Sequence, residues 1–213
     1  MVTGMSTTIQ RHGAGLTWYE NDAMARAAHA LPTEAGVWLV DPFDDEAALA
    51  AAAELGRPAG VIQLLSRHNR DCEAIASRLG VIHHHLPARL PRTPFEVVSV
   101  VERPWWQERA LWWAERATLV VSEAIGTTPL FALGRPAGVH PMPRLVPPRS
   151  ALGGSHPQRL LVGHGPPLDS GGDEALHQAL AASRADLPRF VLKLPGAIRQ
   201  GPRRPAGDEA TTD

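Results

Sequence analysis

Short apolar segments alternate with helix-like segments in the first half of the chain. Residues 36–42, 60–65 and 81–86 are apolar runs of strand length, and the first ends in Asp-Pro, which is typical of a buried strand and its exit turn. Residues 44–56 and 71–80 carry acidic residues near their N-terminal ends and finish on glycine, which indicates helices. Strands that alternate with helices predict a layered α/β domain.

The second half of the chain continues this pattern less regularly. Strands are expected at residues 95–101, 109–113, 117–121 and 159–163, and a helix at 173–185. Residues 134–157 are rich in proline and glycine and predict irregular structure. No internal repeat or linker divides the chain. We therefore expect one domain over residues 11–198, between a flexible N-terminus (1–10) and a disordered C-terminal tail (199–213).

Charge and cysteine content exclude several classes of protein. The 21 Lys+Arg and 22 Asp+Glu residues give a net charge of -1, which offers no bulk attraction for nucleic acid or an anionic membrane. A single cysteine cannot form an internal disulfide, and no apolar run approaches the roughly 18 residues that span a bilayer. The N-terminus lacks the apolar stretch of a signal peptide. We expect a cytoplasmic protein with neither nucleic acid nor membrane as partner.

Polar side chains follow three of the expected strands directly. They lie in residues 65–72, in Val121-Ser-Glu-Ala124 and in residues 161–166, where His164 stands between two glycines. Loops at the strand ends of α/β folds carry function, and acid, thiol and imidazole groups are the usual ligands of metal ions. We expect these three segments at the strand ends, called the strand-exit site below, to form the candidate site.

From about Val37 to Ala185 the chain resembles the hydrolases of the metallo-β-lactamase fold. Asp41-Pro42 is similar to the Asp-Pro that ends a strand in that family, Leu119-Val-Val-Ser-Glu123 to its "LVVGD" strand, and Gly163-His164-Gly165 to its "GHG" turn. The resemblance implies an αββα sandwich, with two mixed β-sheets packed face to face and helices outside. It also implies a two-zinc site built from a Thr-His-x-His-x-Asp-His motif, a bridging aspartate and a final histidine.

The metal motif of the family is altered in this sequence. In the better register Ser66 takes the place of the threonine, and the four ligand places are taken by Arg67, Asn69, Asp71 and Cys72. A shift by one residue keeps His68 but puts Arg70 in the place of the aspartate. Neither register keeps more than one ligand position.

The other ligand positions of the family are also incomplete. Glu123 replaces the bridging aspartate, no histidine lies between Leu86 and Glu123 where the family has its middle one, and only His164 is retained. An arginine cannot donate a lone pair to a metal ion. The residues of the vestigial pocket are Asp41, Ser66, Arg67, His68, Asn69, Asp71, Cys72, Glu123 and His164.

Three functions are compatible with this pattern. The favoured one is a metal-free member of the fold that binds a small molecule or a partner protein without hydrolysis, with Glu123 paired to Arg67 or Arg70. The first alternative is a hydrolase of an ester, thioester or lactam with one zinc ion on Asp71, Cys72, Glu123 and His164. The second is a structural or oligomerising protein.

Ordinary structural roles compete with each of these assignments. Cys72 is expected as a small buried side chain or a reactive thiol, Asp71 as a helix cap or a ligand, and His164 as a turn residue or a ligand. Successive histidines at 83–85 alternate across a strand and cannot converge on one ion. Trp105, Trp106, Trp112 and Trp113 form either core packing or a homodimer contact.

Overall fold

The computed structural model describes residues 6–67, 70–190 and 192, and its strands form two large mixed sheets. The first sheet runs in chain order through β1 (Thr7–His12), β2 (Gly15–Glu20), β3 (Ala27–Thr33), β4 (Gly36–Val40), β5 (Pro58–Gln63) and β6 (His83–His85). The second has the order β12 (Arg159–Val162), β9 (Thr118–Val121), β8 (Trp106–Trp113), β7 (Glu96–Arg103). Strands β10 (Ile125–Gly126) and β11 (Gly138–Val139) form a separate pair.

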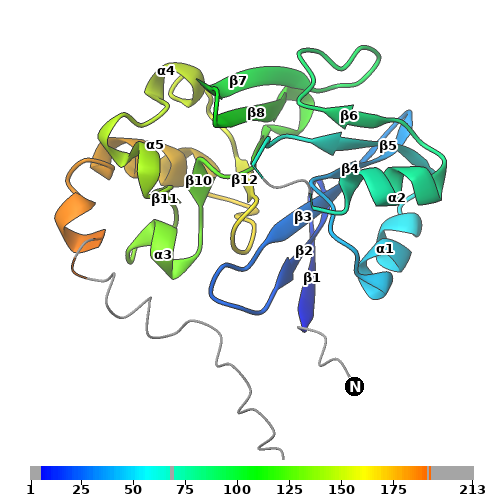
Figure 1. Cartoon of the computed structure of the whole chain (residues 1–213), viewed down its shortest axis with the longest axis horizontal. Helices are drawn as coiled ribbons and strands as arrows, with labels where there is room; N and C mark the ends of the chain where they lie inside the picture. The colour runs from blue at the N-terminus through cyan, green and yellow to red at the C-terminus, as the bar shows by residue number, and fades with distance from the viewer. Residues whose placement is uncertain (1–5, 68–69, 191, 193–213) are drawn as a thin grey trace, which may run out of the picture.

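Helices pack outside both sheets. They are α1 (Glu46–Ala53), α2 (Cys72–Leu79), α3 (Pro129–Ala132), α4 (Arg149–Leu152) and α5 (Gly172–Ala182), with short 3-10 helices at Ala114–Arg116 and Met142–Leu145. One of them, α3, packs on the β10–β11 pair. In Figure 1, α1 and α2 lie at the right beside the first sheet, and α4 and α5 lie at the left beside the second. No helix within the described part of the chain is long and apolar enough to cross a membrane.

Three apolar clusters hold these layers together. The cluster between the sheets contains Trp38 and Ile62 from the first sheet and Leu111, Trp113 and Leu161 from the second. A second cluster joins α1 and α2 to the outer face of the first sheet, and a third joins α5 to the outer face of the second. The order of layers is therefore helix, sheet, sheet, helix, which confirms the expected αββα sandwich.

Local signals place the first two helices where the sequence predicts them. The side chain of Asp45 accepts a hydrogen bond from the Ala48 amide (2.8 Å) and caps the start of α1. Helix α2 ends at Gly80, whose φ of 66° lies in the left-handed region that glycine adopts at little cost. The irregular stretch at 134–157 contains only short elements, the longest of them four residues.

The expectation of a flexible N-terminus is wrong for residues 7–10. These residues belong to β1, which pairs antiparallel with β2 from Thr7 opposite Glu20 to His12 opposite Gly15. β1 is the edge strand of its sheet, and an edge strand can alternate polar and half-buried residues without a strong apolar signal. Residues 1–5 and the expected disordered tail lie outside the described residues.

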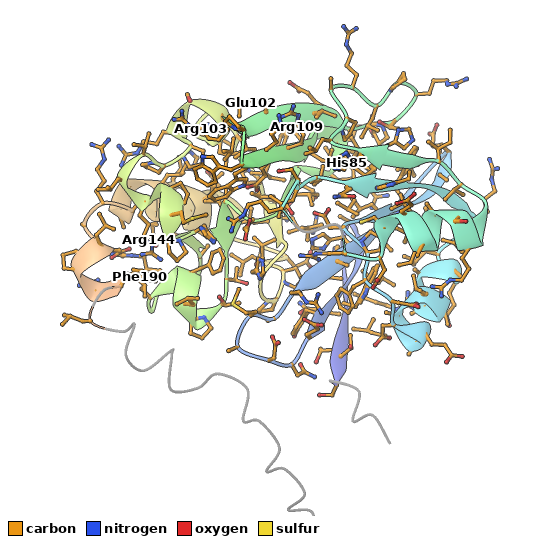
Figure 2. All side chains as sticks on the ribbon, viewed as in Figure 1. His85, Glu102, Arg103, Arg109, Arg144 and Phe190 are labelled. Atoms are coloured by element: carbon orange, nitrogen blue, oxygen red, sulfur yellow. The ribbon has the colours of Figure 1, made fainter. Side chains whose placement is uncertain are left out.

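The segment that follows α5 packs against the irregular region through a buried arginine. Arg144 is 1% exposed, donates a hydrogen bond to the Phe131 carbonyl oxygen (2.7 Å), and lies 5.2 Å from the centre of the Phe190 ring. Figure 2 labels Arg144 and Phe190. Arg135 also pairs with the buried carboxylate of Asp186 (3.1 Å). These contacts extend the domain to residue 190 at least.

Candidate functional site

Asp41 joins the ends of three strands at one edge of the sandwich. It follows β4 with a positive φ of 47°, and its carboxylate accepts hydrogen bonds from the Leu64 amide (2.9 Å) after β5 and from the Ser122 hydroxyl (2.7 Å) after β9. Gly163 brings the end of β12 to the same place, since a Cβ there would lie 2.0 Å from the Ser122 carbonyl oxygen. The Asp41 carboxylate therefore holds the ends of these strands together at this edge.

The guanidinium group of Arg70 lies at the centre of the same edge. It donates hydrogen bonds to the carbonyl oxygens of Ala27, Asp41 (3.0 Å) and Gly163 (3.1 Å), which belong to three separate segments. Burial lowers the pKa of Arg70, and the nearby Asp41 carboxylate opposes that effect. Arg70 thus binds backbone oxygens, and it does not pair with Glu123.

Glu123 faces an arginine and a histidine in an aromatic surrounding. Its side chain is almost fully buried, with one oxygen 3.6 Å from Arg67 Nη1 and the other 3.6 Å from His140 Nε2. The Arg67 guanidinium lies over the Trp106 ring, 5.2 Å from its centre. The expected ion pair between Glu123 and Arg67 is present, and a cation therefore already neutralises this carboxylate.

Two residues of this pocket were missed by the sequence analysis. Glu108 on β8 is fully buried and accepts hydrogen bonds from the amides of Glu123 (2.7 Å) and Ala124 (2.9 Å) and from the Trp106 indole (3.1 Å). Burial raises the pKa of Glu108 to about 7, and the neighbouring Glu123 adds to the rise. His140 follows β11, in the stretch that predicted only irregular structure.

A sequence signal for Glu108 does exist. In β8 every second residue from Trp106 to Ala110 is buried, so the strand pattern places Glu108 inward between them. A carboxylate on an inward face needs hydrogen-bond donors, which identifies it as part of a polar site. His140 carries no comparable signal, because its position depends on contacts of its ring with Trp106 and Phe131.

His164 lies at the end of β12, where the resemblance places the last metal ligand. Its Nδ1 lies 2.9 Å from the Met24 carbonyl oxygen, so this nitrogen carries the proton and donates it. The ring is 3% exposed and stacks on Phe131 with 5.3 Å between ring centres. The tautomer and the orientation of His164 are therefore fixed by its surroundings.

The structure does not bring together the four ligands of the alternative zinc site. Among the described residues, Asp71, Cys72, Glu123 and His164 form no group of three or more whose ligand atoms lie within 4.8 Å of one another. The Cys72 thiol is buried among the side chains between α1, α2 and the first sheet. The Asp71 carboxylate accepts a hydrogen bond from the Asp44 amide (2.8 Å) and caps no amide of α2. Asp71 therefore occupies the N-cap position of α2 without a side-chain cap, and the four proposed ligands do not converge in this structure.

The remaining motif residues do not supply a metal site either. Ser66 exchanges hydrogen bonds with the backbone of Gln107 (2.9 and 3.0 Å) and joins the motif loop to β8. His68 and Asn69 lie outside the described residues. The donor set within the described residues, with Arg67 and Arg70 at the motif, does not fit the two-zinc centre of the resembled family.

Burial also predicts an inert thiol at Cys72. Burial raises the pKa of this thiol well above its usual range, and the thiolate is the reactive form. We expect a thiol-reactive dye to label less than about a tenth of the folded protein in the time that labels all of the urea-unfolded protein. Mass spectrometry of timed samples measures this, and rapid stoichiometric labelling of the folded protein would contradict it.

The three consecutive histidines lie on two faces of β6, as expected. His83 Nε2 is 3.0 Å from the Gln63 side-chain oxygen, whereas the His84 ring packs on Trp38 at 5.5 Å on the opposite face. His83 and His85 line an open groove of about 780 Å³ between α2 and the sheet. The other residues of the groove are Gln63, Arg70, Asp71, Glu73, Ala74 and Ser77.

The clustered tryptophans contribute mainly to the core. Trp106 and Trp113 are buried, and Trp112 is half-buried against the core under α5. Only Trp105 among the four is exposed, at 61%. A dimer surface made of all four indoles is therefore not present on this chain.

Comparison with known proteins gives a result at the level of fold. No protein-family model matches the sequence, and neither does any curated protein. Solved structures do match. DIM-1 metallo-β-lactamase exposed to ceftazidime has a TM-score of 0.55 and 12% identity, over 84% of this chain and 97% of that one. The mono-zinc form of the metallo-β-lactamase FIM-1 from Pseudomonas aeruginosa has a TM-score of 0.55 and 10% identity, over 85% and 96%. Identities this low establish the fold alone.

Proposed function

From the metallo-β-lactamase fold of this chain and the arginine at its strand-exit site, we propose that the protein binds a small polar molecule and does not hydrolyse it. The observation that carries this proposal is the Arg67 guanidinium, 3.6 Å from the buried carboxylate of Glu123. In the resembled family the carboxylate at this place binds metal. In this chain the Arg67 guanidinium takes the place of the metal ion beside Glu123. A zinc ion would therefore have to compete with an arginine for this carboxylate.

The groove beside α2 supplies the binding surface of the proposal. Arg70 lines this groove and also binds carbonyl oxygens of the strand-exit site, so one side chain connects the two. Hydrogen-bond donors of Arg70 and His83 and acceptors of Asp71 and Glu73 line it together. This mixture favours a ligand that carries both hydrogen-bond donors and acceptors.

The metal content of protein purified without an affinity tag tests the proposal that the strand-exit site holds no catalytic zinc. We expect the metal content per chain to be the same in the wild type and in His164→Ala. We also expect no turnover of ester, thioester or lactam substrates above the buffer rate with added zinc. About one zinc per chain that disappears in His164→Ala, together with turnover, would contradict the proposal and restore a metallo-hydrolase.

A pair of matched substitutions tests the groove. Ala74 and Ala50 are exposed alanines on α2 and α1, and only Ala74 lines the groove. A ligand from a thermal-shift screen of small polar compounds should raise the Tm of the wild type and of Ala50→Trp, but not of Ala74→Trp. An equal shift in both variants would place the ligand elsewhere.

A further inference from the structure

Two imidazoles and a carboxylate meet on the outer side of the second sheet, remote from the strand-exit site. His156 lies in the loop before β12, and Asp173 and His177 lie one turn apart on α5. One carboxylate oxygen of Asp173 is 3.1 Å from His156 Nδ1 and 2.8 Å from His177 Nδ1. Among the described residues this is the only group of three His, Cys, Asp or Glu side chains with ligand atoms within 4.8 Å of one another.

The two rings are oriented so that the same nitrogen of each points to the same place. Their planes are 17° apart and their centres 5.1 Å apart, with both Nδ1 atoms at the shared oxygen of Asp173. The other nitrogen of His177, Nε2, lies 3.1 Å from the carbonyl oxygen of Gly153 at the end of α4. A ligating histidine commonly donates its second N–H to a carbonyl oxygen, because that bond fixes the ring and its tautomer.

His177 already faces oxygen acceptors on both sides of its ring. Besides Gly153 O and the Asp173 carboxylate, its Nδ1 is 2.9 Å from the Asp173 carbonyl oxygen. These three oxygen acceptors around one ring favour a cation at this point.

We propose that His156, Asp173 and His177 bind one divalent transition-metal ion of the zinc type. The ligands are Nδ1 of each histidine and one oxygen of Asp173, with water at the remaining position. Ligand atoms around one tetrahedral zinc are about 3.4 Å apart, so each Nδ1 has to move only slightly away from the Asp173 oxygen. Side-chain exposures of 71% for His156, 52% for Asp173 and 38% for His177 leave the ion a path from solvent.

The position of this site indicates a stabilising role. The ion would join the loop before β12 to α5, and the Gly153 contact would link both to α4. His156 precedes β12 and His164 follows it, so the new site and the strand-exit site lie beyond opposite ends of that strand. Binding at one can therefore be measured with the other removed.

Titration of the tag-free, chelator-treated chain with zinc chloride tests the proposal. We expect about one zinc per chain by calorimetry and a higher Tm with zinc. His156→Ala should weaken binding at least about tenfold and abolish the Tm shift. Asp173→Asn keeps the shape of the side chain and should weaken binding as well.

Two controls assign the bound ion to a site. The double variant His83→Ala/His85→Ala removes the competing histidines of β6, and His164→Ala removes the histidine of the strand-exit site; both should bind zinc as the wild type does. No zinc binding at millimolar zinc overturns the proposal. So does binding that survives His156→Ala or that is lost in either control. Loss in His164→Ala alone would contradict the proposed function as well, whereas loss in His156→Ala alone leaves that function intact.

Discussion

Replacement of Arg70 by methionine is expected to lower the free energy of unfolding by about 3 to 5 kcal/mol. The guanidinium group of Arg70 donates to carbonyl oxygens of three buried residues, Ala27, Asp41 and Gly163. Methionine fills a similar volume but donates no hydrogen bond, so the oxygens lose a charged donor that water cannot replace inside the fold. Urea unfolding followed by circular dichroism measures the difference.

Arg78 provides the matched control for this experiment. It forms a two-point ion pair with Asp44 (2.7 and 3.0 Å), but the two side chains are 51% and 54% exposed. Arg78→Met should therefore leave the free energy of unfolding nearly unchanged. Arg70→Lys should fall between the two methionine variants, because one ammonium cannot match the spread of the guanidinium donors. A loss below about 1 kcal/mol in Arg70→Met would show that these hydrogen bonds do not hold the strand ends together.

The fold was predictable where local signals and burial coincide. The apolar run before Asp41 and the capped segment after Asp45 carry both the pattern and the end signals of a strand and a helix. Strands β1 to β3 were missed because β1 is a half-exposed edge, and β2 and β3 are buried along most of their length without simple alternation. Their pairing depends on partners distant in the sequence, which no local pattern contains.

Of the candidate site, the sequence predicted only those residues whose side chains are typical metal ligands or partners of such ligands. Glu123 and His164 follow strands directly, and the ion pair of Glu123 with Arg67 follows from the need of a buried carboxylate for a partner. The position of Cys72 was ambiguous because a thiol beside a charged loop and a thiol in a core have the same sequence context. His140, Glu108 and the group at His156 are brought to their partners by packing of the second sheet, which the sequence does not specify residue by residue.

A buried hydrogen-bonded chain at the N-terminal hairpin makes stability depend on pH. The Ala14 amide donates to His12 Nδ1 (3.3 Å), His12 Nε2 lies 3.0 Å from the Thr17 hydroxyl, and that hydroxyl lies 2.8 Å from His29 Nδ1. Burial lowers the pKa of His12 from 6.5 to about 4, with Asp169 opposing and Arg159 adding to the fall. The unfolded chain therefore binds more protons than the folded protein between these values, so this stabilisation is complete above pH 6.5 and is lost as the pH falls toward 4.

Comparison of the wild type with His12→Gln isolates this effect. Glutamine does not titrate, so the stability of the wild type relative to the variant should fall by about 3 kcal/mol between pH 7 and pH 4. That value follows from a difference of about 2.5 in pKa at about 1.4 kcal/mol for each. Urea unfolding at half-unit pH intervals gives the two curves. Parallel curves would show that His12 does not titrate with a lowered pKa.

Glu108 changes stability with pH in the opposite direction to His12. The pH dependence of wild-type stability alone therefore cannot reveal either group. Burial raises its pKa from 4.5 to about 7, so the folded protein binds more protons than the unfolded chain in this range, and that stabilisation is lost as the pH rises. The stability of the wild type relative to Glu108→Gln should therefore increase by about 3 kcal/mol as the pH falls from 7 to 4.5. His12 and Glu108 therefore oppose each other in the wild type, and only the two difference curves separate their contributions. Opposite slopes in the two difference curves are the expected result, and slopes of the same sign would contradict the burial of one of these groups.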